Sequence, residues 1–211
     1  MDAKFWHSRW QSNKIGFHEG ETNALLAKHF NQLNLKKNSR IFLPLCGKTK
    51  DIEWLLTQGY QVAGIELSET AVEALFDDLG ASPNITRTGK LLHFSHENLD
   101  IYAGDIFDLS TTTLGPVDVI YDRAALVALP PAIRNEYTSH LAELTHRAPQ
   151  FLICFEYDQS LMEGPPFSVD AAEVNKQYAH LYNVTHLATT EVVDGLRQVV
   201  DATETVWLLQ H

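Results

Sequence analysis

The chain has 211 residues, of which 45% are hydrophobic and 20% charged, and its formal net charge at pH 7 is −11. This composition is typical of an ordinary globular protein with a sizeable core, and the length favours one domain. The acidic balance argues against a nucleic-acid or acidic-membrane partner, because either would need clustered Lys and Arg. A monomer is favoured, since no apolar surface stripe is evident.

The N-terminal segment and the two cysteines bear on location. Residues 1–10 contain no apolar core of signal-peptide length, and no apolar segment approaches the roughly 18 to 20 residues that span a bilayer. Cys46 and Cys154 are too few for a disulfide framework, and both stand in or beside apolar runs. We therefore predict a cytoplasmic protein whose cysteines are reduced and largely buried.

Helical patterns come first along the chain. Trp6 and Trp10 share one face of a helix, and a second amphipathic helix begins at Thr22. From residue 39 onward apolar strand patterns alternate with helical ones, which is the signature of a parallel sheet covered on both faces. We expect strands at 40–44, 61–66, 99–104, 117–121, 150–156, 184–190 and 205–209. We expect helices at 49–58, 69–79 and 131–146.

Two connections depart from this alternation. Residues 80–98 are expected to form an excursion or a short hairpin, and the last two strands are too closely connected for a crossover helix, so they are expected to be antiparallel. The sequence thus predicts one α/β domain over residues 1–211. It has a doubly wound, mostly parallel, seven-stranded sheet in a core at 39–211, and an N-terminal helical extension at 1–38.

The turn after the first strand decides what kind of ligand is expected. Pro44 closes the strand, and the turn is then Leu45-Cys46-Gly47-Lys48. Gly47-Lys48-Thr49 resembles the end of a phosphate-binding loop, but Phe42 stands where the first glycine of that loop is needed. The three-glycine dinucleotide fingerprint is also absent. A phosphate cradle is therefore not expected here.

Two acidic residues stand at neighbouring strand ends. Glu66 ends the second strand 19 residues after Gly47, close to the roughly 20 expected for a carboxylate that binds ribose hydroxyls. Asp105 ends the third strand, where its carboxylate or a neighbouring N–H can bind adenine. A ribose site without a phosphate site indicates an adenosine ligand that lacks phosphates, most obviously S-adenosylmethionine. The alternative is that Glu66 and Asp105 only cap the following helix or turn.

Seven motifs give the sequence a family resemblance over nearly the whole chain. They are Trp6 with Trp10, Phe17-His18, PLCGK at 44–48, VAGIELSE at 62–69, IFDL at 106–109, YDRAALVAL at 121–129 and GPPF at 164–167. In these motifs the sequence resembles the thiopurine S-methyltransferases. The resemblance implies a Rossmann-like class I methyltransferase fold. It also implies methyl transfer from S-adenosylmethionine to sulfur of aromatic and heterocyclic thiols, with S-adenosylhomocysteine as the product.

The resemblance also assigns residues. It implies cofactor contacts at Trp10, Leu45, Glu66, Asp105, Ile106 and Arg123. We add Gly47, the glycine of the turn after the first strand. It places Phe17 against the substrate ring, and Phe17 and Trp10 would together cover the site as a mobile lid belonging to residues 1–38.

No residue is a certain catalyst, because an aromatic thiol is substantially ionised near neutral pH and needs no strong general base. Arg123 and Arg197 are candidates near the reacting groups. Arg123 binds the cofactor carboxylate or favours the thiolate, or else forms a structural ion pair with Asp122 or Glu156. The GPPF segment either walls the substrate pocket or is a rigid turn.

Other functions stay open at this point. His93, His96 and Glu97 suggest a metal cluster, but they lack the required spacing, so no metal is predicted. Within the methyltransferases, the acceptor can instead be a selenium, tellurium or halide species. From other classes, the alternatives are a nicotinamide-dependent oxidoreductase, disfavoured by the missing glycine fingerprint, and a cofactor-binding module without transfer activity.

Overall fold

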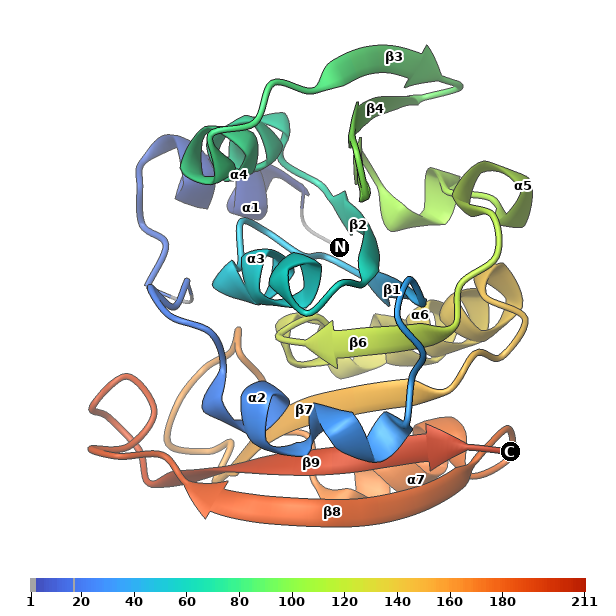
Figure 1. The fold of residues 1–211 in the computed structure, drawn as a ribbon. Helices are drawn as coiled ribbons and strands as arrows, with labels where there is room; N and C mark the ends of the chain where they lie inside the picture. The colour runs from blue at the N-terminus through green and yellow to red at the C-terminus, as the bar shows by residue number, and fades with distance from the viewer. Residues whose placement is uncertain (1–2, 17) are drawn as a thin grey trace. The chain divides into compact units, whose positions relative to one another are not determined.

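The computed structural model describes residues 3–16 and 18–211, and the chain divides into two compact units (Figure 1). The N-terminal unit lies within residues 2–119, and the C-terminal unit is residues 120–211. Phe17 lies outside the described residues, so its assignment to the substrate stays a prediction. A single domain over 1–211 with a helical lid at 1–38 also stays a prediction.

The N-terminal unit alternates helices with five strands. Its elements are α1 (Ala3–Gln11), α2 (Ala24–His29), η1 (Phe30–Leu33), β1 (Arg40–Leu43), α3 (Lys50–Thr57), β2 (Gln61–Glu66), α4 (Glu69–Leu79), β3 (Asn84–Thr88), β4 (Leu91–His96), β5 (Leu99–Ala103), η2 (Ile106–Asp108) and α5 (Thr111–Leu114). The strand order is β3-β4-β5-β2-β1. β1, β2 and β5 are parallel, whereas β3 pairs with β4, and β4 with β5, in antiparallel fashion.

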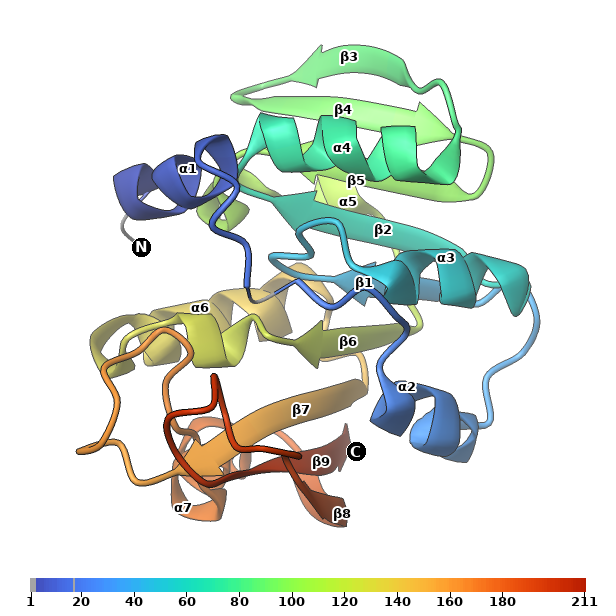
Figure 2. The ribbon, with the colours of Figure 1, turned by 90° about the vertical axis from the view of Figure 1, so that its left-hand side faces the viewer.

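The parallel strands are apolar because both of their faces are covered. Every residue of β1 and β2 after the first is buried. Helix α4 contacts β2 and β5, α3 contacts β2, and α1 contacts α4 (Figure 2). The carboxyl ends of β1, β2 and β5 therefore meet at one edge of the unit, as parallel strands must.

Two strands come from residues 80–98, where we expected an excursion or a short hairpin, and a hairpin is what forms. Residues 84–96 form the β3–β4 hairpin, whose turn contains Gly89 at φ 61°. All five residues of β3 are exposed, so this strand carries no alternation of apolar and polar residues. With four strands in the C-terminal unit, the described chain has nine strands, and the predicted seven is wrong.

The C-terminal unit contains four strands in the order β6-β7-β9-β8. Its elements are β6 (Val119–Arg123), η3 (Leu126–Ala128), α6 (Pro131–Leu144), β7 (Gln150–Tyr157), α7 (Ala171–Tyr178), β8 (Asn183–Glu191) and β9 (Ala202–Gln210). β6 and β7 are parallel, and β9 pairs antiparallel with both β7 and β8. The antiparallel C-terminal strands are confirmed, whereas β6 begins two residues later than predicted.

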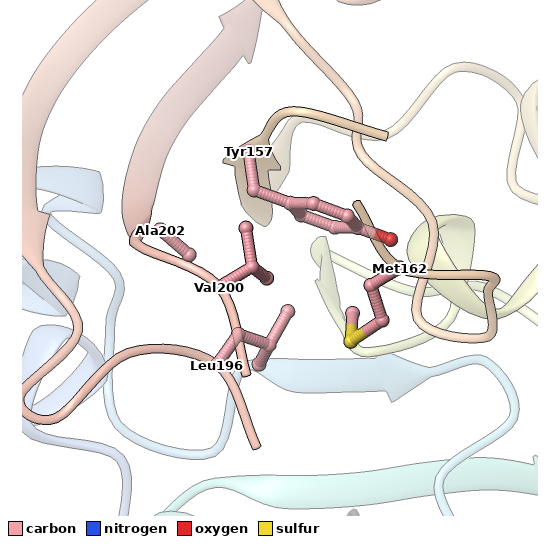
Figure 3. Packing of buried hydrophobic residues seen from close by; sticks show 5 residues of the cluster. All are labelled: Tyr157, Met162, Leu196, Val200 and Ala202. Atoms are coloured by element: carbon pink, nitrogen blue, oxygen red, sulfur yellow. The ribbon is translucent and has the colours of Figure 1, made fainter. Parts of the chain in front are cut away.

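A small apolar cluster joins two loops of the C-terminal unit. Tyr157 and Met162 pack against Leu196, Val200 and Ala202 (Figure 3). The loop that follows β7 and the loop between β8 and β9 therefore share a core of their own.

Both cysteines are free and buried, as expected. Cys46 packs beside β2, and a Cβ added at Gly64 would lie 2.9 Å from its sulfur. Burial raises the pKa of the Cys46 thiol well above its usual value, and the nearby Glu66 carboxylate raises it further. A thiol held in this protonated form is a packing group rather than a nucleophile.

Candidate functional site

The turn after β1 has an unusual backbone. Leu45 and Gly47 both have positive φ, at 47° and 54°. For a leucine this left-handed conformation costs about 1 to 2 kcal/mol, so the surrounding structure must impose it. The Cys46 N–H donates to the Ile65 carbonyl at 2.9 Å and thereby fixes the turn against the end of β2.

The Glu66 carboxylate lies against this turn. One carboxylate oxygen accepts the Gly47 N–H at 2.9 Å and the other accepts the Ser68 N–H at 2.9 Å. Glu66 is only 6% exposed. Burial raises the pKa of Glu66, while the backbone N–H groups that stabilise the ionised form counteract part of that rise. The carboxylate is thus held in one orientation at the strand end predicted for it.

The Trp10 ring covers Gly47. A Cβ added at Gly47 would lie 3.2 Å from Trp10 Cζ2 and 3.6 Å from Cη2. The glycine therefore makes room for the indole. Trp10 is 9% exposed. Its ring contacts Gly47, and the Gly47 N–H donates to Glu66, so these three predicted site residues lie together.

Gly47→Ala should disturb this packing. The new methyl group meets the indole, and alanine must also adopt the left-handed conformation, so we expect a red shift of tryptophan emission and a loss of about 2 kcal/mol of stability. Urea unfolding followed by fluorescence measures both. Gly89→Ala is the matched control, because Gly89 has φ 61° but nothing within 4 Å of an added Cβ. Equal effects of the two substitutions would contradict the contact with Trp10.

Asp105 and Ile106 follow β5 beside the same edge. The Gly104 N–H donates to the Glu66 carbonyl at 2.9 Å, which ties this turn to the end of β2. One oxygen of Asp105 accepts the Phe107 N–H at 3.1 Å, so Asp105 does cap the short η2 helix. The second oxygen of Asp105 can still accept a hydrogen bond from adenine, so the predicted role of Asp105 at the adenine stays a prediction. Ile106 is 3% exposed.

In the C-terminal unit, Arg123 ends β6 and follows a buried carboxylate. Asp122 is fully buried and accepts the Tyr137 hydroxyl at 2.7 Å and the Leu126 N–H at 3.1 Å. Ala124, next along the chain, has φ 65°. Asp122 therefore anchors the loop that begins at Arg123. The assignment of Arg123 to the cofactor stays a prediction.

The same burial makes stability depend on pH. Desolvation raises the pKa of Asp122 from 3.8 to about 6. Because the folded state then binds the proton more tightly than the unfolded state, stability increases as pH falls through 6 and stops increasing below about 4. Relative to Asp122→Asn, the unmodified protein should gain about 1 to 1.5 kcal/mol between pH 7.5 and pH 5. Urea unfolding of both proteins at the two pH values measures this gain, and a constant difference would contradict it.

Arg197 lies in the loop between β8 and β9 and donates to the Pro165 carbonyl. The Tyr157 hydroxyl donates to the Pro166 carbonyl at 2.6 Å, and Gln159 donates to that hydroxyl at 2.9 Å. The GPPF segment is therefore held from two sides within the C-terminal unit. Roles of Arg197 and GPPF at the substrate stay predictions.

The histidines considered for a metal have other partners. The His93 ring nitrogen lies 2.8 Å from Asp100 and its ring stacks on Tyr102, while His96 lies 3.1 Å from the Ser82 carbonyl. Among the described residues no group of three or more His, Cys, Asp or Glu side chains is arranged to hold a metal ion. Within the same residues, no helix combines the length and the apolar character needed to cross a membrane.

Solved structures show which class of protein this fold belongs to. One is the 1,6-didemethyltoxoflavin-N1-methyltransferase of Burkholderia thailandensis, with a TM-score of 0.66 at 15% identity, covering 99% of this chain and 87% of that one. Another is the magnesium protoporphyrin IX methyltransferase of Synechocystis, with a TM-score of 0.65 at 15% identity over 100% of both chains. The fold is that of the class I methyltransferases.

Sequence comparison is more specific. A sequence model of the thiopurine S-methyltransferase family matches residues 1–211. The thiopurine S-methyltransferase of Xanthobacter autotrophicus is 53% identical over 212 residues, covering 100% of both chains. That of Acinetobacter baylyi is 47% identical over 214 residues, covering 99% of this chain and 98% of its own. The chain belongs to the thiopurine S-methyltransferase family and is an S-adenosylmethionine-dependent methyltransferase, so the oxidoreductase alternative is set aside.

Proposed function

We propose that the enzyme methylates the sulfur of aromatic or heterocyclic thiols. The observation that carries this proposal is the similarity along the entire chain to relatives named thiopurine S-methyltransferase, at 53% and 47% identity. The formal net charge of −11 does not attract a strongly anionic acceptor, which fits a small uncharged thiol.

The edge of the N-terminal unit supports the cofactor assignment. The Glu66 carboxylate is fixed by two backbone N–H groups, yet each of its oxygens keeps a further lone pair that can accept a ribose hydroxyl. The turn at Leu45 and Gly47 lies beside it, and Asp105 and Ile106 follow the neighbouring strand. These residue types suit an adenosine group without phosphates, so the site fits the cofactor.

The bound cofactor supplies an electrophilic methyl group on a sulfonium. The protein's part is to position the two reactants in line and to keep water from the thiolate, and both effects can lower the barrier substantially. In our proposal Glu66 orients the ribose, Trp10 and Leu45 border the amino-acid portion, and Asp105 with Ile106 binds the adenine. Arg123 would bind the cofactor carboxylate, as the resemblance implies.

The acceptor is tested by a panel. The purified enzyme is incubated with methyl-labelled S-adenosylmethionine and, separately, with aromatic thiols, selenium and tellurium oxyanions, and halides. We expect labelled thioethers from the aromatic thiols. Volatile methylated products in the headspace from the other acceptors alone would replace the thiol proposal, and cofactor binding without any product would indicate a binding module.

A further inference from the structure

A pocket lies in the N-terminal unit next to the proposed cofactor edge. Its volume is about 370 Å³, within the range of about 300 to 1,000 Å³ usual for small-molecule sites. Its walls come from α1, the turn from β2 into α4, the β3–β4 hairpin and the end of β5. The six cofactor residues predicted in this unit, Trp10, Leu45, Gly47, Glu66, Asp105 and Ile106, are all absent from the lining.

The lining offers groups that bind anions. Arg87 and Lys90 of the hairpin and His7 of α1 line the pocket. Arg87 is exposed and makes no ion pair with any described residue, whereas Lys90 pairs with Asp108 at 2.8 Å. The Lys90 side chain is 79% exposed, so this surface pair is weak and can exchange for another anion.

The start of α4 adds hydrogen-bond donors. The backbone N–H groups of Glu69 and Thr70, the first two residues of α4, have no intrahelical acceptor, and both residues line the pocket. Ser68 stands at the capping position and is 2% exposed, yet its hydroxyl makes no capping hydrogen bond to the described helix. Ser68 also lines the pocket, so its hydroxyl can donate to a ligand bound there.

We propose that this pocket binds a small oxyanion of the phosphate class, through Arg87, the Ser68 hydroxyl and the first turn of α4. The overall electrostatic field of the protein does not attract an anion to this pocket, because the net charge is −11 and the Glu69 carboxylate also lines the pocket. The donors must therefore be local. Ser68 links the pocket to the cofactor edge, since its N–H donates to Glu66 while its side chain lines the pocket.

Calorimetric titration of inorganic phosphate into the cofactor-free protein, at constant ionic strength, tests the proposal. We expect saturable binding of one phosphate, weakened about tenfold by Arg87→Ala and about fivefold by Ser68→Ala. Lys28→Ala is the matched control, because it removes one positive charge from an exposed side chain of helix α2 in the same unit. Absence of saturable binding, or variants that bind as tightly as the unmodified protein, would overturn the proposal.

Two further arms define the site. Phenyl phosphate carries the same anion on a larger body; tighter binding than inorganic phosphate supports a phosphorylated small molecule, and equal binding supports a free anion. S-adenosylhomocysteine is titrated into the phosphate-saturated protein, and we expect both ligands to bind together. Mutual exclusion would overturn a separate site. Failure of S-adenosylhomocysteine to bind even without phosphate would count against the proposed cofactor site alone.

Discussion

Glu66→Ala is expected to weaken S-adenosylhomocysteine binding at least about a hundredfold. A hydrogen bond to a charged group contributes about 1.5 to 3 kcal/mol, and in the proposed site this carboxylate accepts two ribose hydroxyls. The substitution also leaves the Gly47 and Ser68 N–H groups without their acceptor. Calorimetric titration of the product into both proteins measures the change in affinity.

Two controls separate binding from folding. Glu73→Gln removes one exposed acid from α4 and should leave the affinity unchanged. Urea unfolding must show that Glu66→Ala still folds cooperatively under the titration conditions. A folded Glu66→Ala protein that binds the product within about threefold of the unmodified protein would remove Glu66 from the site.

Tyr137→Phe is expected to lower the free energy of unfolding at pH 7.5 by about 2 to 3 kcal/mol. The Tyr137 hydroxyl is a donor to the fully buried Asp122 carboxylate, at 2.7 Å, and its loss leaves a buried charge with fewer hydrogen bonds. At pH 5 the deficit should shrink, because Asp122, whose pKa is raised to about 6 by burial, is then mostly protonated. Urea unfolding at both pH values provides the comparison.

Tyr182→Phe is the matched control. The Tyr182 hydroxyl donates to a neutral acceptor, the Ala148 carbonyl, at 3.3 Å, so its loss should cost about 1 kcal/mol and show little dependence on pH between 5 and 7.5. If the two substitutions cost the same amount and respond alike to pH, the Asp122 carboxylate is not the group that Tyr137 stabilises.

Apolar runs in the sequence predicted the parallel strands well, because β1 and β2 are buried on both faces and contain hardly any polar residues. β3 was not predicted as a separate strand, since all of its residues are exposed and its place depends only on backbone pairing with β4. Gly47 was predicted as the single glycine of the turn, and Glu66 from its spacing to Gly47 and from the resemblance; in the structure the Gly47 N–H donates to the Glu66 carboxylate.

The supporting residues could not be predicted in the same way. Tyr137 lies on α6, 15 residues beyond Asp122, and no spacing rule links a helix tyrosine to a strand-end carboxylate. The contact of Trp10 with Gly47 joins segments 37 residues apart, although both residues were predicted site members. Ser68 did carry a local signal, since a serine before a helical run is a capping residue, but its N–H bond to Glu66 follows from the turn geometry.

The most direct test of the account is transfer of labelled methyl from S-adenosylmethionine to an aromatic thiol by the unmodified enzyme and by Glu66→Ala. The account predicts a labelled thioether from the unmodified enzyme, and a rate at subsaturating cofactor at least about a hundredfold lower for the variant. An unmodified enzyme that binds the cofactor but methylates none of the thiols, or a folded variant with an undiminished rate, would contradict it.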